Sequence, residues 1–119
     1  MDKKFIEEFL DFTKSNNVTT KSDFHKVTIL SDEVEIATIN EDGTLTINMS
    51  NQVGLTKDFV GIMLDYNIKF SPIIDKEYKF LKGINLSNDK GLCLTITTDN
   101  KIVLPTNVGE WHSLARFFQ

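Results

Sequence analysis

The chain of 119 residues has a formal net charge of −4, which argues against a protein that binds polyanions through a generally basic surface. Its content of 40% hydrophobic and 25% charged residues is typical of a globular protein and argues against a disordered low-complexity chain. We therefore expect a single domain, residues 1–119, with a hydrophobic core.

One cysteine, Cys93, excludes an intrachain disulfide, and we interpret it as a small apolar filler. No apolar run approaches the roughly 18 residues that span a bilayer. The N-terminal segment carries acids within its apolar pattern and is unlike a signal peptide. We expect a cytoplasmic protein with no membrane contact. The bias toward Lys, Asn, Asp and Ile is similar to that of proteins from AT-rich bacteria and their phages.

The first predicted element is an amphipathic helix that Asp2 caps and that ends at residues 15–17. Its apolar face repeats at three- and four-residue spacings: Phe5, Ile6, Phe9, Leu10 and Thr13. Residues 24–30 are the first predicted strand. Residues 34–48 predict a β-hairpin, because two alternating runs are joined by acidic residues and Gly43. Leu45, Ile47 and Met49 are expected to share one face.

A second helix is predicted to begin at a Thr56 cap, with an inward face of Phe59, Val60, Ile62, Met63 and Tyr66. Gly61 inside it indicates close packing on the sheet. Ser71-Pro72 predicts a chain break, and residues 75–84 predict a strand with Tyr78 and Phe80 on one face.

Residues 85–91 read as a polar turn, and residues 92–104 predict a second hairpin. In that hairpin Leu92, Leu94 and Ile96 are expected inward and Cys93 outward. Asn107, with Glu110 three residues later, predicts the start of a last helix.

The predicted order is therefore α-βββ-α-βββ-α. The fold class is α+β: a bent antiparallel sheet or OB-like barrel of five to six strands with two to three packing helices. The two halves follow the same plan, and residues 29–64 align with residues 84–118 with small gaps. An internal duplication is a hypothesis that this alignment raises.

Enzyme motifs are absent from the sequence, so we expect a non-enzymatic protein with no cofactor and no metal. There is no glycine-rich phosphate loop and no Gly-x-Ser-x-Gly sequence, and His25 and His112 lie far apart. Acidic residues concentrate in residues 21–50, with six acids against two lysines. They read as a solvated edge and turn; the alternatives are a divalent-cation site and, as a third reading of function, a small hydrolase or nuclease using residues 32–35.

Residues 69–82 form the one stretch typical of a binding site. Four lysines accompany aromatic residues there, against only two acids. Aromatic rings stack on bases while lysines follow the phosphates of a single strand. The predicted nucleic-acid-binding residues are Lys69, Lys76, Tyr78, Lys79, Phe80 and Lys82. The alternative is that Tyr78 and Phe80 belong to the core.

Three families resemble the chain. In strand order and size it is similar to the small OB-type single-stranded-DNA-binding proteins of phages, although it lacks the acidic tail ending in Pro-Phe of the bacterial proteins. Its tail, NKIVLPTNVGEWHSLARFF, resembles the last strand and helix of the Whirly-type single-stranded-DNA binders. Its acidic character and helix order resemble those of type III secretion chaperones, which are dimers that hold partner segments.

Two of the three resemblances imply single-stranded DNA as the ligand. We therefore predict a non-enzymatic, phage-encoded single-stranded-DNA-binding protein that forms homo-oligomers. The alternative is an acidic protein-binding module: a secretion-chaperone-like protein, an immunity protein or a phage anti-defence factor.

Overall fold

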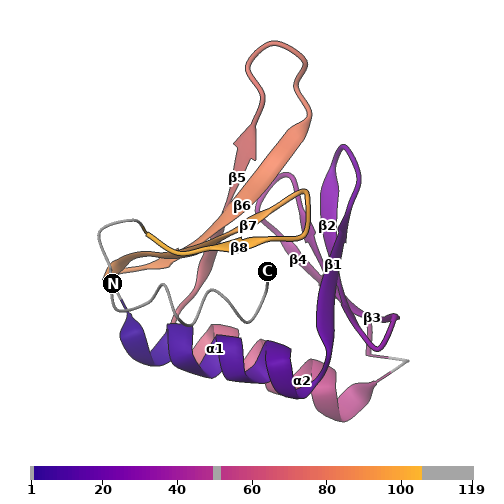
Figure 1. Ribbon diagram of the computed structural model, residues 1–119, viewed down its shortest axis with the longest axis vertical. Helices are drawn as coiled ribbons and strands as arrows, with labels where there is room; N and C mark the ends of the chain where they lie inside the picture. Colours follow the sequence, from indigo (N-terminus) through magenta and orange to yellow (C-terminus); the bar gives the residue numbers. More distant parts are fainter. Residues whose placement is uncertain (1, 50–51, 106–119) are drawn as a thin grey trace.

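The computed structural model describes residues 2–49 and 52–105, and the predicted last helix lies outside this part of the chain. The described chain is an α+β structure of two halves, each a helix followed by four strands. Each set of four strands forms its own antiparallel sheet, in the order β1-β2-β3-β4 and β5-β6-β7-β8. Both helices lie side by side at one end of the sheets (Figure 1).

The first half contains α1 (Lys3–Ser15), β1 (Val18–Ser22), β2 (Lys26–Ser31), β3 (Val34–Asn40) and β4 (Leu45–Ile47). The helix begins as predicted, because the Asp2 carboxylate accepts a hydrogen bond from the Phe5 N–H at 3.2 Å. It ends at Asn16, and Asn17 takes a left-handed conformation with φ of +49° that redirects the chain into β1.

The second half contains α2 (Val53–Asp65), β5 (Lys69–Ile74), β6 (Leu81–Asn88), β7 (Gly91–Thr97) and β8 (Ile102–Val103). Here Asn67, with φ of +54°, turns the chain after the helix as Asn17 does in the first half.

The two sheets have the same strand register. Thr20 pairs with Ile29 in the first sheet, and Phe70 pairs with Leu86 in the second. The register of β2 on β3 shifts between Ile29 and Leu30, and that of β6 on β7 shifts between Leu86 and Ser87. The equivalence of paired positions, including the β-bulge, supports the hypothesis of an internal duplication.

The inner faces of both sheets and the apolar faces of both helices form one core. The fully buried large side chains come from equivalent strands of the two halves and from both helices: Phe5, Ile6, Val27, Ile29, Ile36, Ile39, Phe59, Leu81, Ile84, Leu86, Leu94 and Ile96. Their burial removes apolar surface from water, which is the main stabilising contribution to such a fold.

Polar contacts join the two sheets near their turns. The Thr20 hydroxyl donates to Asn100 Oδ1 at 2.8 Å, and the Ser22 hydroxyl donates to the Thr98 carbonyl at 2.7 Å. At the equivalent place in the other half, Gly43 has φ of +85°, and a Cβ there would lie 2.7 Å from the Phe70 carbonyl oxygen. Glycine is therefore required at this turn for both its conformation and the close approach of β5.

The predicted hairpins at residues 34–48 and 92–104 are confirmed as β3–β4 and β7–β8. The expected single sheet or OB-like barrel of five to six strands is wrong, because eight strands form two sheets that do not close into a barrel. The order α-βββ-α-βββ is also wrong, since each described helix precedes four strands.

Both missing strands are at sheet edges. β1 gives little apolar signal because it alternates half-buried and exposed residues and contains mostly Thr, Lys and Ser. β5 contains Pro72, which the sequence reading took for a chain break. Proline is accommodated there because β5 pairs only with β6, so no partner strand needs the missing N–H.

Several predicted orientations are corrected. Cys93 is buried and Leu92 exposed, because the bulge in the β6–β7 pair shifts the alternation. The predicted polar turn at residues 85–91 is shorter, since β6 continues to Asn88. On the first sheet, Ile47 and Met49, which were expected to share one face, are both exposed.

The predicted features of α2 are also corrected. The helix begins at Val53 rather than after Thr56, whose buried hydroxyl donates to the Asn48 carbonyl at 3.3 Å. Gly61 does not mark close packing on the sheet, because a Cβ there would meet nothing within 4 Å.

Candidate nucleic-acid interface

The β5–β6 hairpin projects beyond the rest of the molecule, and its loop contains residues 75–80 (Figure 1). The strand expected at residues 75–84 is wrong for residues 75–80, because Asp75 turns the chain before β6 begins at Leu81, and it is confirmed for residues 81–84. The Asp75 carboxylate accepts hydrogen bonds from the N–H groups of Tyr78 at 2.8 Å and Glu77 at 2.9 Å. These bonds favour the charged carboxylate, so the Tyr78 N–H in particular lowers the pKa of Asp75.

Hydrogen bonds between backbone groups also stabilise the loop. The Asp75 N–H donates to the Phe80 carbonyl at 2.9 Å, and the Lys79 N–H donates to the Asp75 carbonyl at 3.0 Å. Lys79 has φ of +60°, a left-handed conformation that completes the turn. The side chains of the loop therefore project from a hydrogen-bonded backbone.

Three aromatic rings form a row at this hairpin. The ring centroids of Tyr78 and Phe80 lie 6.4 Å apart, with planes inclined by 20°, and those of Phe80 and Phe24 lie 6.5 Å apart at 75°. Tyr78 is 72% exposed, Phe24 is 70% exposed, and Phe80 between them is half-buried. We call Tyr78, Phe80 and Phe24 the aromatic row.

Phe24 comes from the other half of the molecule, in the turn between β1 and β2. The Asp23 carboxylate fixes this turn by accepting from the N–H groups of His25 at 2.7 Å and Lys26 at 3.0 Å. The hydrogen bond from His25 in particular lowers the pKa of Asp23. The Leu81 N–H donates to the Phe24 carbonyl at 3.1 Å, which joins the two hairpins and places Phe24 beside Phe80.

The predicted lysines divide into two groups. Lys76 and Lys79 lie in the loop and Lys82 lies in β6 one residue beyond Leu81, and all three are exposed. Lys79 and Lys82 are close enough to Asp75 to contribute to its lowered pKa. Lys69 begins β5 and pairs with Ser87, so it lies at the opposite end of the hairpin. The structure therefore places three of the four lysines at the end of the hairpin that carries Tyr78 and Phe80.

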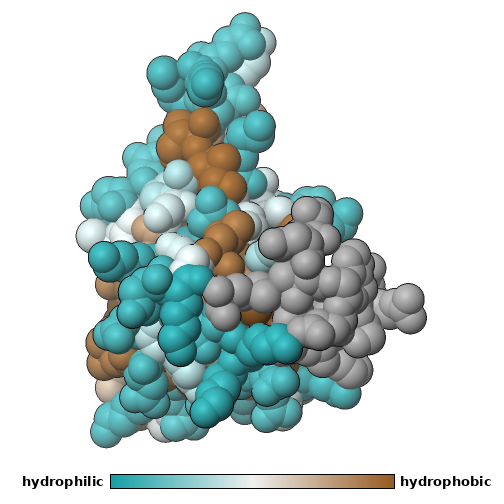
Figure 2. Space-filling view, turned by 90° about the vertical axis from the view of Figure 1, so that its left-hand side faces the viewer, coloured by the Kyte–Doolittle hydropathy of each residue, from teal (hydrophilic) through white to brown (hydrophobic). Residues whose placement is uncertain are grey.

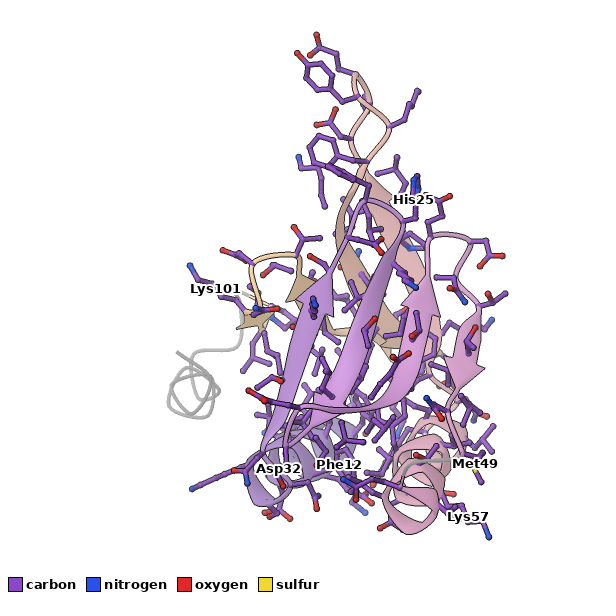
Figure 3. All side chains as sticks on the ribbon, turned by 90° about the vertical axis from the view of Figure 1, so that its right-hand side faces the viewer. Phe12, His25, Asp32, Met49, Lys57 and Lys101 are labelled. Atoms are coloured by element: carbon purple, nitrogen blue, oxygen red, sulfur yellow. The ribbon has the colours of Figure 1, made fainter. Side chains whose placement is uncertain are left out.

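His25 adds a titratable group beside Phe24, at the edge of the first sheet (Figure 3). Its Nδ1 lies 3.0 Å from Glu41 Oε2, and the hydrogen bond with this carboxylate raises the pKa of the imidazole. Protonated His25 thus balances the charge of Glu41 next to the row.

The outer surface of the projecting hairpin changes from hydrophobic on its stalk to hydrophilic at its tip (Figure 2). Ile74, the last residue of β5, is among the exposed large apolar residues.

Sequence reasoning missed Phe24 because it was assigned to a strand, where a large ring is expected to be buried. A signal was present in the sequence: Ser22-Asp23 before Phe24 is typical of a turn, and an aromatic residue in a turn has no sheet face to cover it. The alternative that Tyr78 belongs to the core is wrong, and Phe70 upstream of the site instead packs against the core.

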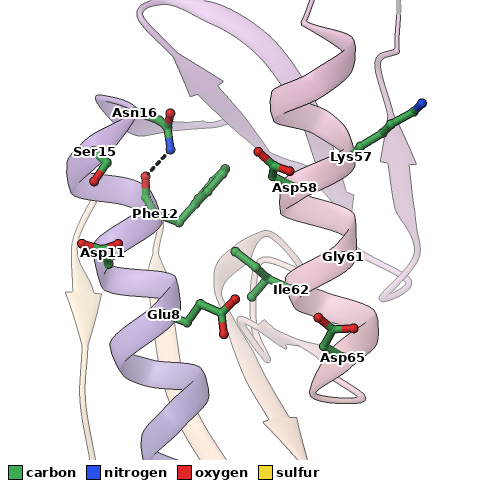
Figure 4. A pocket seen from close by; sticks show the side chains of 10 residues that line it. All are labelled: Glu8, Asp11, Phe12, Ser15, Asn16, Lys57, Asp58, Gly61, Ile62 and Asp65. Atoms are coloured by element: carbon green, nitrogen blue, oxygen red, sulfur yellow. Dashed lines mark hydrogen bonds between the residues drawn. The ribbon is translucent and has the colours of Figure 1, made fainter.

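The other candidate groups are distributed as follows. Among residues 2–49 and 52–105, no three His, Cys, Asp or Glu side chains are placed to hold one metal ion. Burial raises the pKa of the Cys93 thiol. A groove between α1 and α2 is lined by four acids, Glu8, Asp11, Asp58 and Asp65, around Phe12 and Ile62 (Figure 4). No helix in the described part is long and apolar enough to cross a membrane.

Comparison with known proteins gives no relative: no family model, no curated protein and no solved structure matches this chain.

Proposed function

We propose that the chain is a non-enzymatic single-stranded-DNA-binding protein that contacts DNA through the aromatic row and Lys76, Lys79 and Lys82. The observation that carries the proposal is the row itself: three adjacent rings from two hairpins, two of them largely exposed. Each ring offers a face on which a base can stack, and stacking contributes about 1–3 kcal/mol per base.

The lysines of the hairpin supply the electrostatic part of the interaction. Lys76 and Lys79 share the loop with Tyr78, and Lys82 follows on β6. Lysine side chains that replace the counterions of phosphates gain free energy from the release of those ions. A protein that neutralises about three phosphates should bind single strands with a log–log salt slope near −2.

The four acids of the α1–α2 groove lie at the other end of the molecule from the hairpin, whereas Asp23, Glu41, Asp75 and Glu77 lie in or beside the turns that carry the aromatic row (Figure 1). The longest dimension is 39 Å. Charges in solvent are screened over about 10 Å at 0.1 M salt. A strand at the hairpin therefore interacts mainly with the local charges.

The test is a titration of a fluorescent 30-nucleotide oligonucleotide at several salt concentrations, read by anisotropy. The wild-type protein should bind with the negative salt slope, and changing Lys76, Lys79 and Lys82 to Glu should abolish binding without altering the circular dichroism spectrum. Absence of binding at micromolar protein and low salt, or unchanged affinity in the triple variant, would refute the proposal.

A second candidate function, an acidic protein-binding module, is favoured by the groove between α1 and α2. Its four carboxylates and its apolar floor of Phe12 and Ile62 fit a basic amphipathic segment of a partner protein. Under this alternative, one stoichiometric partner should be captured by the wild-type protein and lost on Glu8→Lys and Asp58→Lys substitution. Capture should be unaffected by the substitutions in the hairpin.

The resemblance to phage single-stranded-DNA-binding proteins and the expected homo-oligomer remain predictions. In the tail on which the Whirly-type resemblance depends, β8 is described, and the predicted helix that follows it lies outside the described residues. Light scattering coupled to size exclusion would measure the oligomeric state with and without the oligonucleotide.

A further inference from the structure

A second surface lies next to the aromatic row, on the outer face of the first sheet. A groove of about 290 Å³ is lined by residues of β1, β2 and the turn between them, together with Glu35 of β3. Its lining includes Lys21, Ser22 and Asp23, which directly precede Phe24 in the sequence, and Lys26 and Thr28, which follow it. The groove therefore includes residues on both sides of Phe24 in the β1–β2 turn.

The groove has two exposed ammonium groups on the same side of the sheet. Lys21 pairs with Thr28 across β1 and β2, and Lys26 lies two residues before Thr28, so all three side chains alternate to the outer face. Figure 3 views this face of the first sheet and the tip of the β5–β6 hairpin from the same side. A chain that crosses the rings can continue over this face without turning around the molecule.

The two acids of the groove already have partners. The Asp23 carboxylate accepts two backbone hydrogen bonds within its own turn, and Glu35 Oε1 accepts one from the Thr38 hydroxyl at 3.1 Å. Lys21 and Lys26 do not take part in the ion pairs found among the described residues, although Lys26 is near enough to Asp23 for its charge to help lower the pKa of that carboxyl. The ammonium groups can therefore turn toward an anion at the mouth of the groove.

We propose that a DNA strand bound at the aromatic row continues along this groove, where Lys21 and Lys26 neutralise two of its phosphates. The inference rests on the proposed function, and it extends the site from the second half of the molecule onto the first. It assigns stacking of bases to the hairpin and binding of phosphates to the sheet, so that the bound length exceeds the three bases that three rings can hold.

The experiment compares a short and a long strand, (dT)4 and (dT)12, on the full chain by anisotropy over a range of salt. The variant is Lys21→Gln with Lys26→Gln. The matched control is Lys4→Gln with Lys57→Gln, which removes the same charge from exposed positions on the two helices. Circular dichroism of both double variants verifies the fold.

On (dT)12, the groove variant should show a log–log salt slope smaller in magnitude by about 1.4, because two phosphates lose their lysines. On (dT)4 it should bind like the control. Equal slopes for the groove variant and the control on (dT)12 would overturn the inference alone. Absence of wild-type binding to both strands would overturn the proposed function and this inference with it.

Discussion

The two halves of the molecule share their register and differ chiefly in one hairpin. Between the equivalent pairs Ser22–Val27 and Pro72–Ile84, the first half has four residues and the second half has eleven. The extra seven residues extend the second hairpin into solvent and include the positions of Tyr78 and Phe80 (Figure 1). The buried positions of the two halves are thus equivalent, because both pack into the same core. The halves differ in the length of a hairpin that extends into solvent, where no packing contact limits its length.

The two hairpins nevertheless turn by the same local device. Asp23 accepts from the N–H groups two and three residues later, and so does Asp75. An aspartate at the first position of such a turn satisfies backbone donors that no strand partner can reach. The longer hairpin therefore has the same aspartate hydrogen bonds in its turn, at a greater distance from the core of the protein.

The largest expected effect on DNA binding comes from shortening the β5–β6 hairpin to a length closer to that of the β1–β2 hairpin. Replacing residues 75–80 by Asn-Gly joins Ile74 directly to its pairing partner Leu81 through a two-residue turn. Two rings of the aromatic row are lost, so DNA affinity should fall by about 2–6 kcal/mol. Anisotropy measures the affinity and thermal unfolding verifies the fold; a folded variant that still binds tightly would contradict the site.

Because the two halves have the same register, truncation at equivalent core positions should lower the free energy of unfolding by similar amounts. Ile29 and Leu86 are both fully buried at the same register position, and truncating either to alanine should destabilise the protein by about 2–5 kcal/mol. Chemical denaturation measures both free energies of unfolding. Two separate unfolding transitions in either variant would mean that the halves do not share one cooperative core.

Single ring substitutions sharpen the comparison between the contributions of the two halves. Tyr78→Ala and Phe24→Ala should each weaken DNA binding by about 1–3 kcal/mol through the loss of one stacking face. Leu64→Ala is the matched control, because Leu64 is a large exposed apolar residue on α2. An effect of Tyr78→Ala with none from Phe24→Ala would restrict the site to the second half.

The smallest expected effect is the dependence of turn order on pH, and the turns at Asp23 and Asp75 should both show it. The folded pKa values of Asp23 and Asp75 are lowered by backbone hydrogen bonds. Their contribution to turn order is therefore present above the unfolded value of about 3.9 and is lost as the pH falls through the lower folded value. Carbon-detected NMR titration of the two carboxyl groups measures this directly, and Asp75→Asn in one turn leaves Asp23 as the internal reference.

Local patterns in the sequence predict many of the helices and strands that form the core, but they do not predict the edge strands β1 and β5. The amphipathic first helix and the hairpins at β3–β4 and β7–β8 follow from spacing and turn residues. Val18–Ser22 and the segment containing Pro72 could not be recognised as strands, because an edge strand needs only one half-buried face and one set of backbone partners.

The candidate site was found from composition but not from geometry. Lysines and rings between residues 69 and 82 gave the hairpin, whereas Phe24 is brought to Phe80 by a contact between segments far apart in the chain. The sequence alignment of the halves begins at residues 29 and 84 and so leaves out the β1–β2 and β5–β6 turns, because β1 and β5 had not been recognised as strands. The seven extra residues are visible only when paired strands are compared.

The hydrogen bond between the Leu81 N–H and the Phe24 carbonyl has a consequence for the origin of this surface. One ring is contributed by the first half of the molecule and two by the second, so neither half alone has the whole row. Dividing the chain near residue 50 would leave two pieces, neither of which contains all three rings of the aromatic row.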